Sequence, residues 1–129
     1  MIQPPADRPV YTGEIATYWF DDGLLVSLSN NKQRTVELIT RNVAFVQQLT
    51  GNTPVPLLIY LTKSPMPDKA TRAFSAQQLP VIYKAMAMVS KPGLALFIMN
   101  LLFKMKPPPI PMKSFSNADD AKAWLEQFK

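Results

Sequence analysis

Histidine and cysteine are both missing from the 129 residues of this chain, and their absence limits the chemistry that its side chains can perform. Thiolate nucleophiles, disulfides, zinc sites built from these residues, Ser-His-Asp triads and acid–base catalysis by imidazole are all excluded. Any catalysis within the chain would have to depend on carboxylates or lysines.

Two pairs of adjacent carboxylates are the remaining candidates for acid–base chemistry. Asp21 and Asp22 precede Gly23, and Asp-Gly is a typical hairpin turn. Asp119 and Asp120 lie in the first turn of a predicted helix, where they complement the helix dipole. With only four glycines the chain also lacks a glycine-rich phosphate-binding loop. We therefore expect no catalytic, cofactor-binding or metal-binding residues, and no enzymatic activity.

The segment from Pro92 to Met105 reads PGLALFIMNLLFKM and is almost wholly apolar. A helix that is apolar on all sides must be buried all round, bound to a partner or in contact with lipid. One stripe of this predicted helix suits packing on a sheet, whereas Leu96, Met99 and Phe103 lie toward other sides. These three side chains can pack within their own subunit, against a second copy of the chain or against another protein.

The net charge of +5 comes entirely from the second half of the chain. Five lysines and no acidic residue lie between positions 84 and 113, and Lys91, Lys104 and Lys106 flank the apolar helix. Solubility is the simplest role of these lysines, and an anionic lipid surface is an alternative partner. Helices at a membrane surface favour Trp or Tyr at their edges, and this helix has neither, so we rank protein association first. The basic excess is modest and does not alternate with aromatic residues, so we expect no nucleic-acid partner.

The first half of the chain predicts a hairpin, a helix and a buried strand. Strands 15–21 and 24–30 are joined by the Asp-Gly turn. A helix capped by Thr35 and ended by Gly51 follows, with apolar residues every three to four positions. The continuous apolar run 55–63 is typical of a strand buried on both faces of a parallel sheet.

The second half predicts three further helices and two strands. Asp68 is the expected N-cap of a helix that Pro80 breaks or restarts before Tyr83. Residues 85–90 and 110–116 are the predicted strands, on either side of the apolar helix, and Ser116 is the predicted cap of the last helix.

The predicted order is therefore β-β-α-β-α-β-α-β-α, which is an α/β fold. It comprises a mostly parallel mixed sheet of about five strands, with an N-terminal hairpin and a covering of helices. The length suits a single domain over residues 1–129, in which proline-rich residues 1–11 form an N-terminal arm.

This order of elements, with a Lys-Pro-rich joint leading to PMKSF and then to DDAKAWL, resembles the STAS superfamily. More narrowly, the chain is similar to the uncharacterised SpoIIAA-like branch of stand-alone bacterial proteins. The resemblance covers nearly the whole chain from about Thr12 onward. It implies a SpoIIAA-like fold, with structural kinship to CRAL-TRIO lipid-binding domains.

The sequence departs from the regulatory members of this superfamily at their phosphorylation site. Those members are switched by phosphorylation of a serine in Asp-Ser-Ser-Gly, at the start of the helix after the central strand. The matching stretch here runs Asp68-Lys69-Ala70-Thr71, which keeps the aspartate and lacks the serine. Ser64 and Thr71 are the nearby hydroxyls, and their simplest roles are those of loop and first-turn residues.

The sequence thus predicts a non-enzymatic, STAS-like protein-interaction or regulatory module without cofactors. We expect self-association, as a homodimer, or binding of a protein partner through helix 92–105, with a lipid or anionic membrane surface as the alternative. The absence of cysteine fits a reducing cytoplasm, and the N-terminus does not have the pattern of a signal peptide. No apolar run reaches the roughly 20 residues of a membrane-spanning helix.

Overall fold

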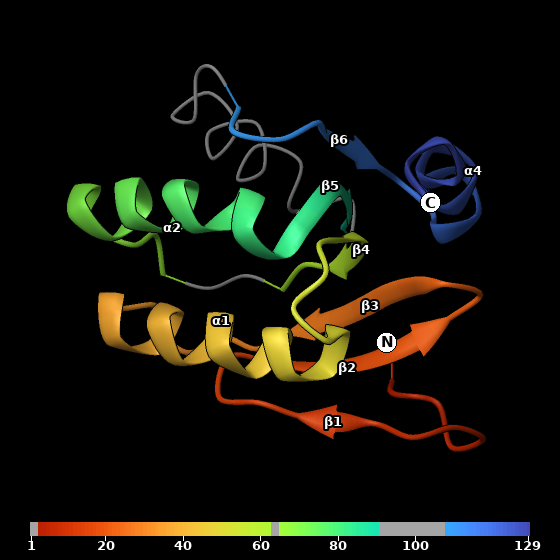
Figure 1. Ribbon diagram of the computed structural model, residues 1–129, viewed down its shortest axis with the longest axis horizontal. Helices are drawn as coiled ribbons and strands as arrows, with labels where there is room; N and C mark the ends of the chain where they lie inside the picture. Colours follow the sequence, from red (N-terminus) through yellow and green to blue (C-terminus); the bar gives the residue numbers. More distant parts are fainter. Residues whose placement is uncertain (1–2, 63–64, 91–107) are drawn as a thin grey trace.

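The computed structural model describes residues 3–62, 65–90 and 108–129, and these residues form an α/β fold (Figure 1). The predicted helix 92–105, its flanking lysines and Ser64 lie outside the described residues. The strands are β1 (Tyr11–Thr12), β2 (Ala16–Asp21), β3 (Leu24–Ser29), β4 (Val55–Tyr60), β5 (Tyr83–Val89) and β6 (Met112–Phe115). The helices are α1 (Val36–Thr50), α2 (Lys69–Ile82) and α4 (Ala118–Leu125), and a short 3₁₀ turn (Glu126–Phe128) follows α4.

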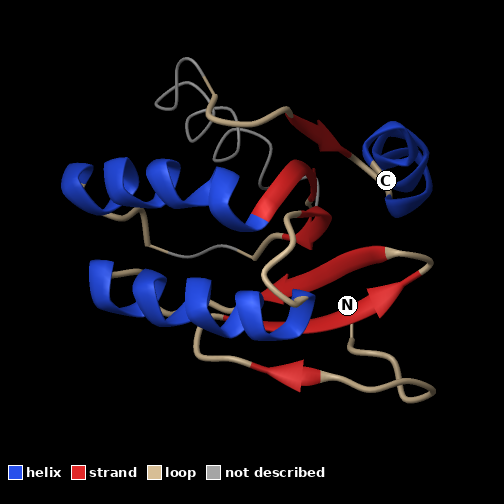
Figure 2. Ribbon diagram, viewed as in Figure 1, coloured by secondary structure: helices blue, strands red, loops and turns tan. Residues whose placement is uncertain are grey.

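The described strands form one mixed sheet of six strands in the order β1-β2-β3-β4-β5-β6. Strands β1, β2 and β3 pair in antiparallel fashion, whereas β3, β4, β5 and β6 run parallel. Helices α1 and α2 lie side by side over one face of this sheet, and α4 lies on the other (Figure 2). The prediction of an α/β fold with a hairpin and a mixed sheet is confirmed.

Successive residues of the central strands point to opposite faces of the sheet, as a pleated strand requires. One row of paired residues faces α1 and α2 and comprises Leu25, Leu57, Met86 and Met112. The next row comprises Val26, Leu58, Ala87 and Lys113, and its first three members are buried on the side of α4. The core therefore has two separate halves, one on each face of the sheet.

The hairpin turn and both ends of α1 lie at the residues that the sequence predicted. Asp22 and Gly23 both have positive φ angles, 52° and 80°, which the two-residue hairpin turn requires. The hydroxyl of Thr35 accepts a hydrogen bond from the backbone N–H of Leu38 and so caps α1. Gly51 ends this helix in the left-handed conformation, with φ 66°.

Three predicted details are wrong. The described residues form six strands, not about five, because Tyr11 and Thr12 pair with β2. Helix α2 continues through Pro80 to Ile82, because a proline in the last turn removes only one helical hydrogen bond. Asn117 rather than Ser116 caps α4, since its side-chain oxygen accepts from the backbone N–H of Asp120.

Asp21 holds three distant parts of the chain together at the end of the hairpin. Its carboxylate lies 3.2 Å from a guanidinium nitrogen of Arg8 in the N-terminal arm and 2.8 Å from the ammonium nitrogen of Lys122 in α4. The hydrogen bond from Lys122, more than that from Arg8, lowers the pKa of Asp21 below its ordinary value. Asp21 is thus an ionic anchor for both the arm and the last helix.

We expect Asp21→Asn to lower the free energy of unfolding by about 1 kcal/mol or less at pH 7, the usual range for partly exposed ion pairs. Because folding lowers the pKa of Asp21, its contribution is complete above the unfolded value of about 3.9 and is lost as the pH falls through the folded value. The difference from wild type should therefore shrink below about pH 4. Urea unfolding of both proteins at pH 7 and pH 3 measures this difference in the free energy of unfolding.

Asp22→Asn is the matched control for this prediction. Asp22 is highly exposed, its carboxylate lies 3.3 Å from the ammonium nitrogen of Lys129, and it has a positive φ angle that asparagine tolerates. We expect this variant to keep wild-type stability at both pH values. If Asp21→Asn lowered the free energy of unfolding as much at pH 3 as at pH 7, the role of Asp21 as an ionic anchor would be contradicted.

Candidate binding cavity

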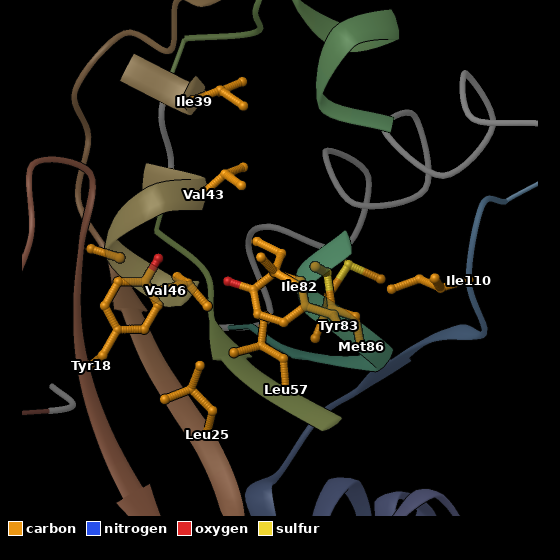
Figure 3. Packing of buried hydrophobic residues seen from close by; sticks show 12 residues of the cluster. Tyr18, Leu25, Ile39, Val43, Val46, Leu57, Ile82, Tyr83, Met86 and Ile110 are labelled. Carbon is orange, nitrogen blue, oxygen red and sulfur yellow. The ribbon is translucent and has the colours of Figure 1, made fainter. Parts of the chain in front are cut away.

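A cavity of about 210 Å³ lies between helices α1 and α2 and the sheet. Side chains of β2, β3, β4, β5 and β6 form its floor, and side chains of the two helices form its walls. Ile39 and Val43 of α1 point toward the side on which Ile82 lies at the end of α2 (Figure 3). Most of the remaining floor and wall is also apolar, with contributions from Ile15, Ala16, Leu57, Ile59, Leu79 and three methionines.

Small residues on the floor explain why this face of the sheet is incompletely filled. Ala16 and Ser29 are paired neighbours on β2 and β3, and Ser27 lies two positions before Ser29 on the same face. The positions on β4 and β5 that lie in the same row as Ser27 carry the larger residues Ile59 and Met88. The small side chains of Ala16, Ser27 and Ser29 therefore leave space beneath α1 and α2.

Three methionines, Met86, Met88 and Met112, line the side of the cavity formed by β5 and β6. Methionine is unbranched and polarizable, so it adapts to guests of different shape. Met88 is almost completely buried, whereas Met112 is half-buried. This part of the floor therefore combines an enclosed methionine with a more accessible one.

Two buried tyrosines place hydroxyl groups in the cavity. The hydroxyl of Tyr18 donates a hydrogen bond of 2.8 Å to the side-chain oxygen of Asn42 on α1. The hydroxyls of Tyr18 and Tyr83 point toward each other (Figure 3). Burial is the largest cause that raises the pKa of both phenols, and for Tyr83 the proximity of Tyr18 raises it further. Both phenols are consequently neutral at physiological pH and act as hydrogen-bonding groups.

Ser27 is the one buried side chain of the described residues whose polar atom has no hydrogen-bond partner. It is 1% exposed and lies on the cavity floor, between Tyr18 of β2 and Ile59 of β4 in the same row. Its neighbour Ser29 differs, because the Ser29 hydroxyl hydrogen-bonds to the carbonyl of Tyr60 and to Thr62. A buried hydroxyl without a partner costs roughly 1–3 kcal/mol, which makes Ser27 the least satisfied group of the site.

The two arginines of the cavity lining donate hydrogen bonds to backbone carbonyls. The guanidinium of Arg34 donates to the carbonyls of Ile15, Asn30 and Lys32, and burial lowers its pKa. The guanidinium of Arg72 on α2 donates to the carbonyl of Pro67. No aspartate, glutamate or lysine is among the described residues that line the cavity. The site therefore offers hydroxyl, amide and apolar contacts rather than an acid–base pair.

Asp68, Lys69 and Thr71 are the described residues of the predicted switch loop, and they lie at the beginning of α2, outside the cavity lining. Asp68 caps this helix, and its carboxylate accepts a hydrogen bond of 2.7 Å from the backbone N–H of Thr71. That backbone hydrogen bond is the main cause that lowers the pKa of Asp68. Lys69 is exposed, whereas Thr71 is only 4% exposed, so its hydroxyl is enclosed by the fold.

The predicted interaction surface lies outside the described residues. This applies to Leu96, Met99, Phe103, Lys91, Lys104 and Lys106, and also to Ser64 of the predicted switch loop. The structure therefore brings together a different set of residues, namely those of the cavity. One sequence signal pointed toward it, because Ser27 and Ser29 occupy the second face of a predicted strand whose first face is fully apolar.

Two further properties bear on the expected function. Within residues 3–62, 65–90 and 108–129, no three potential ligands drawn from Asp and Glu come together in a way that could hold a metal ion. In that same part of the chain, no helix has both the length and the apolar character that crossing a membrane requires.

Comparison with known proteins gives one match. Residues 18–129 match the family model described as "Domain of unknown function (DUF7793)". No curated protein and no solved structure matches the chain. The matched range begins within β2 and continues through α4, so it covers every lining residue of the cavity except Ile15 and Ala16.

Proposed function

This chain belongs to the DUF7793 family, and we propose that it is a non-enzymatic binding module that holds a small, largely apolar molecule between α1, α2 and the sheet. The observation that carries this proposal is the cavity of about 210 Å³. An apolar cavity of ~150 Å³ is large enough to bind benzene. The site therefore suits a molecule with a single substituted ring or a short alkyl chain.

The chemistry of the lining supports binding rather than catalysis. Ligand sites are typically apolar, with a few polar groups that orient the ligand, and this cavity has that composition. Its phenols have raised pKa values and its arginines hydrogen-bond to backbone carbonyls, so none of them is prepared for proton transfer at neutral pH.

We expect toluene to enter the cavity and to shift the NMR signals of the methyl groups of Met86, Met88 and Met112 in protein labelled with [¹³C-methyl]methionine. The signal of Met66, which lies in the loop before α2 and outside the cavity lining, serves as an internal reference. Saturable shifts confined to the three lining methionines are the expected result. Unchanged signals at saturating toluene would refute the proposal.

A pair of variants on α1 separates binding in the cavity from binding elsewhere. Val43→Phe adds volume at a lining position and should weaken toluene binding at least tenfold. Val36→Phe adds the same group to the same helix at a position that is 41% exposed, and should bind like wild type. Circular dichroism checks that both variants are folded.

A second candidate function is self-association through residues 92–105, which rests on the sequence of that segment. Its apolar side chains exceed what one sheet face can cover, and an apolar patch on a small protein is most often matched by a second copy. The STAS resemblance supports this candidate. The hairpin of β2 and β3, followed by three strands that run parallel to β3, supports the SpoIIAA-like assignment, which we retain as a proposal along with a cytoplasmic location.

Static light scattering over a dilution series tests self-association, and co-sedimentation with anionic vesicles tests the lipid alternative. We expect a mass of twice 14.5 kDa that falls on dilution, and a smaller mass for Met99→Glu. Sedimentation with vesicles by a monomeric protein would favour the lipid surface instead. A monomer at all concentrations that also ignores vesicles would exclude both.

A further inference from the structure

We propose that the ligand of this cavity is a neutral molecule with a hydroxyl group on an otherwise apolar body, and that Ser27 recognises this hydroxyl. This inference rests on the proposed binding function and names the chemical class of its ligand. The observation that carries it is Ser27, a residue of the cavity lining that is 1% exposed and whose hydroxyl has no hydrogen-bond partner among the described residues.

A ligand hydroxyl can satisfy the hydroxyl of Ser27. The serine hydroxyl is both a donor and an acceptor, and a hydroxyl partner can match either role. The Tyr18 hydroxyl differs from that of Ser27, because it donates to Asn42 and faces the hydroxyl of Tyr83. The floor around these groups is apolar, which favours a ring or alkyl chain as the rest of the molecule.

The charges around the cavity favour a neutral ligand over an ionic one. A cation would find no carboxylate among the described lining residues. An anion would have to compete for Arg34 with three backbone carbonyls, and for Arg72 with the carbonyl of Pro67. Burying an ionic group without a dedicated partner costs far more than burying a hydroxyl that has one.

The measurement compares toluene, p-cresol and p-toluate in the same methionine-methyl titration. Toluene and p-cresol differ by one hydroxyl, so the ratio of their dissociation constants isolates the contribution of that group. In a purely apolar cavity p-cresol binds more weakly than toluene, because its hydroxyl loses water without compensation. With Ser27 as partner, we expect wild type to bind p-cresol at least as tightly as toluene.

Ser27→Ala should then shift this ratio against p-cresol by about three- to tenfold, the range of one net hydrogen bond. Ser114→Ala, which removes an exposed serine hydroxyl from β6 outside the cavity lining, is the control and should leave the ratio at its wild-type value. An equal shift in both variants would overturn the role of Ser27.

The remaining outcomes separate the two proposals. Toluene binding without any effect of Ser27→Ala on the ratio would refute the hydroxyl recognition and leave the binding function standing. Tighter binding of p-toluate than of p-cresol would overturn the choice of a neutral ligand. Failure of all three probes to shift the lining methionines would refute the binding function itself.

Discussion

Leu58→Ala should lower the free energy of unfolding by about 2–5 kcal/mol, the range measured when alanine replaces a buried leucine. Leu58 is 0% exposed and occupies the centre of the sheet on the side of α4. Val26 and Ala87 flank it on the neighbouring strands. Small globular proteins have a total stability of about 5–15 kcal/mol, so this one substitution would remove a large share.

Urea unfolding followed by far-UV circular dichroism measures this loss. Val81→Ala is the control, because Val81 is 43% exposed near the end of α2, and its truncation should change stability by less than about 0.5 kcal/mol. A loss at Leu58 as small as that of the control would mean that this half of the core is loosely packed.

Ala121→Leu should cost about 1–3 kcal/mol or more by overfilling the contact between α4 and the sheet. Ala121 is 0% exposed and faces Ala85 and Ala87 of β5, which are also completely buried. Three alanines at one contact allow a helix and a sheet to approach closely. Three additional carbon atoms in that contact would force α4 away from β5.

Ala123→Leu on the same helix provides the matched comparison. Ala123 is exposed, so the larger side chain extends into water and should leave stability nearly unchanged. Thermal unfolding of the two variants and of the wild type gives the comparison in one experiment. Equal melting temperatures for Ala121→Leu and Ala123→Leu would show that α4 is not held by this close contact.

The elements with strong local signals were predictable from the sequence. The Asp22-Gly23 turn, the Thr35 cap and the Gly51 end each depend on residue types with a direct conformational preference, and each lies where it was expected. The two-residue strand β1 escaped prediction because its position depends on pairing with Tyr18 and Thr17. Such pairing is a long-range property and leaves little trace in a short segment.

The cavity was harder to predict, because it is the space that side chains from distant parts of the sequence leave unfilled. In the sequence, Ser27 is simply one of two serines that alternate with apolar residues along the predicted strand 24–30. Only the register that sets it between Tyr18 and Ile59, below α1 and α2, shows that its hydroxyl is buried without a partner. Sequence patterns predict which faces are apolar, but they do not measure the volume left between them.

Consecutive side chains of β4 lie on opposite faces of the sheet and therefore have different roles. Leu57 lines the cavity, whereas Leu58 lies on the opposite face of the sheet, beneath α4. Substitutions on the two sides are separated by the backbone of the sheet, so their effects on stability should be close to additive. A library confined to Leu57, Ile59 and the three lining methionines could thus retune which molecules are accepted, while the alanine-lined side continues to hold the scaffold together.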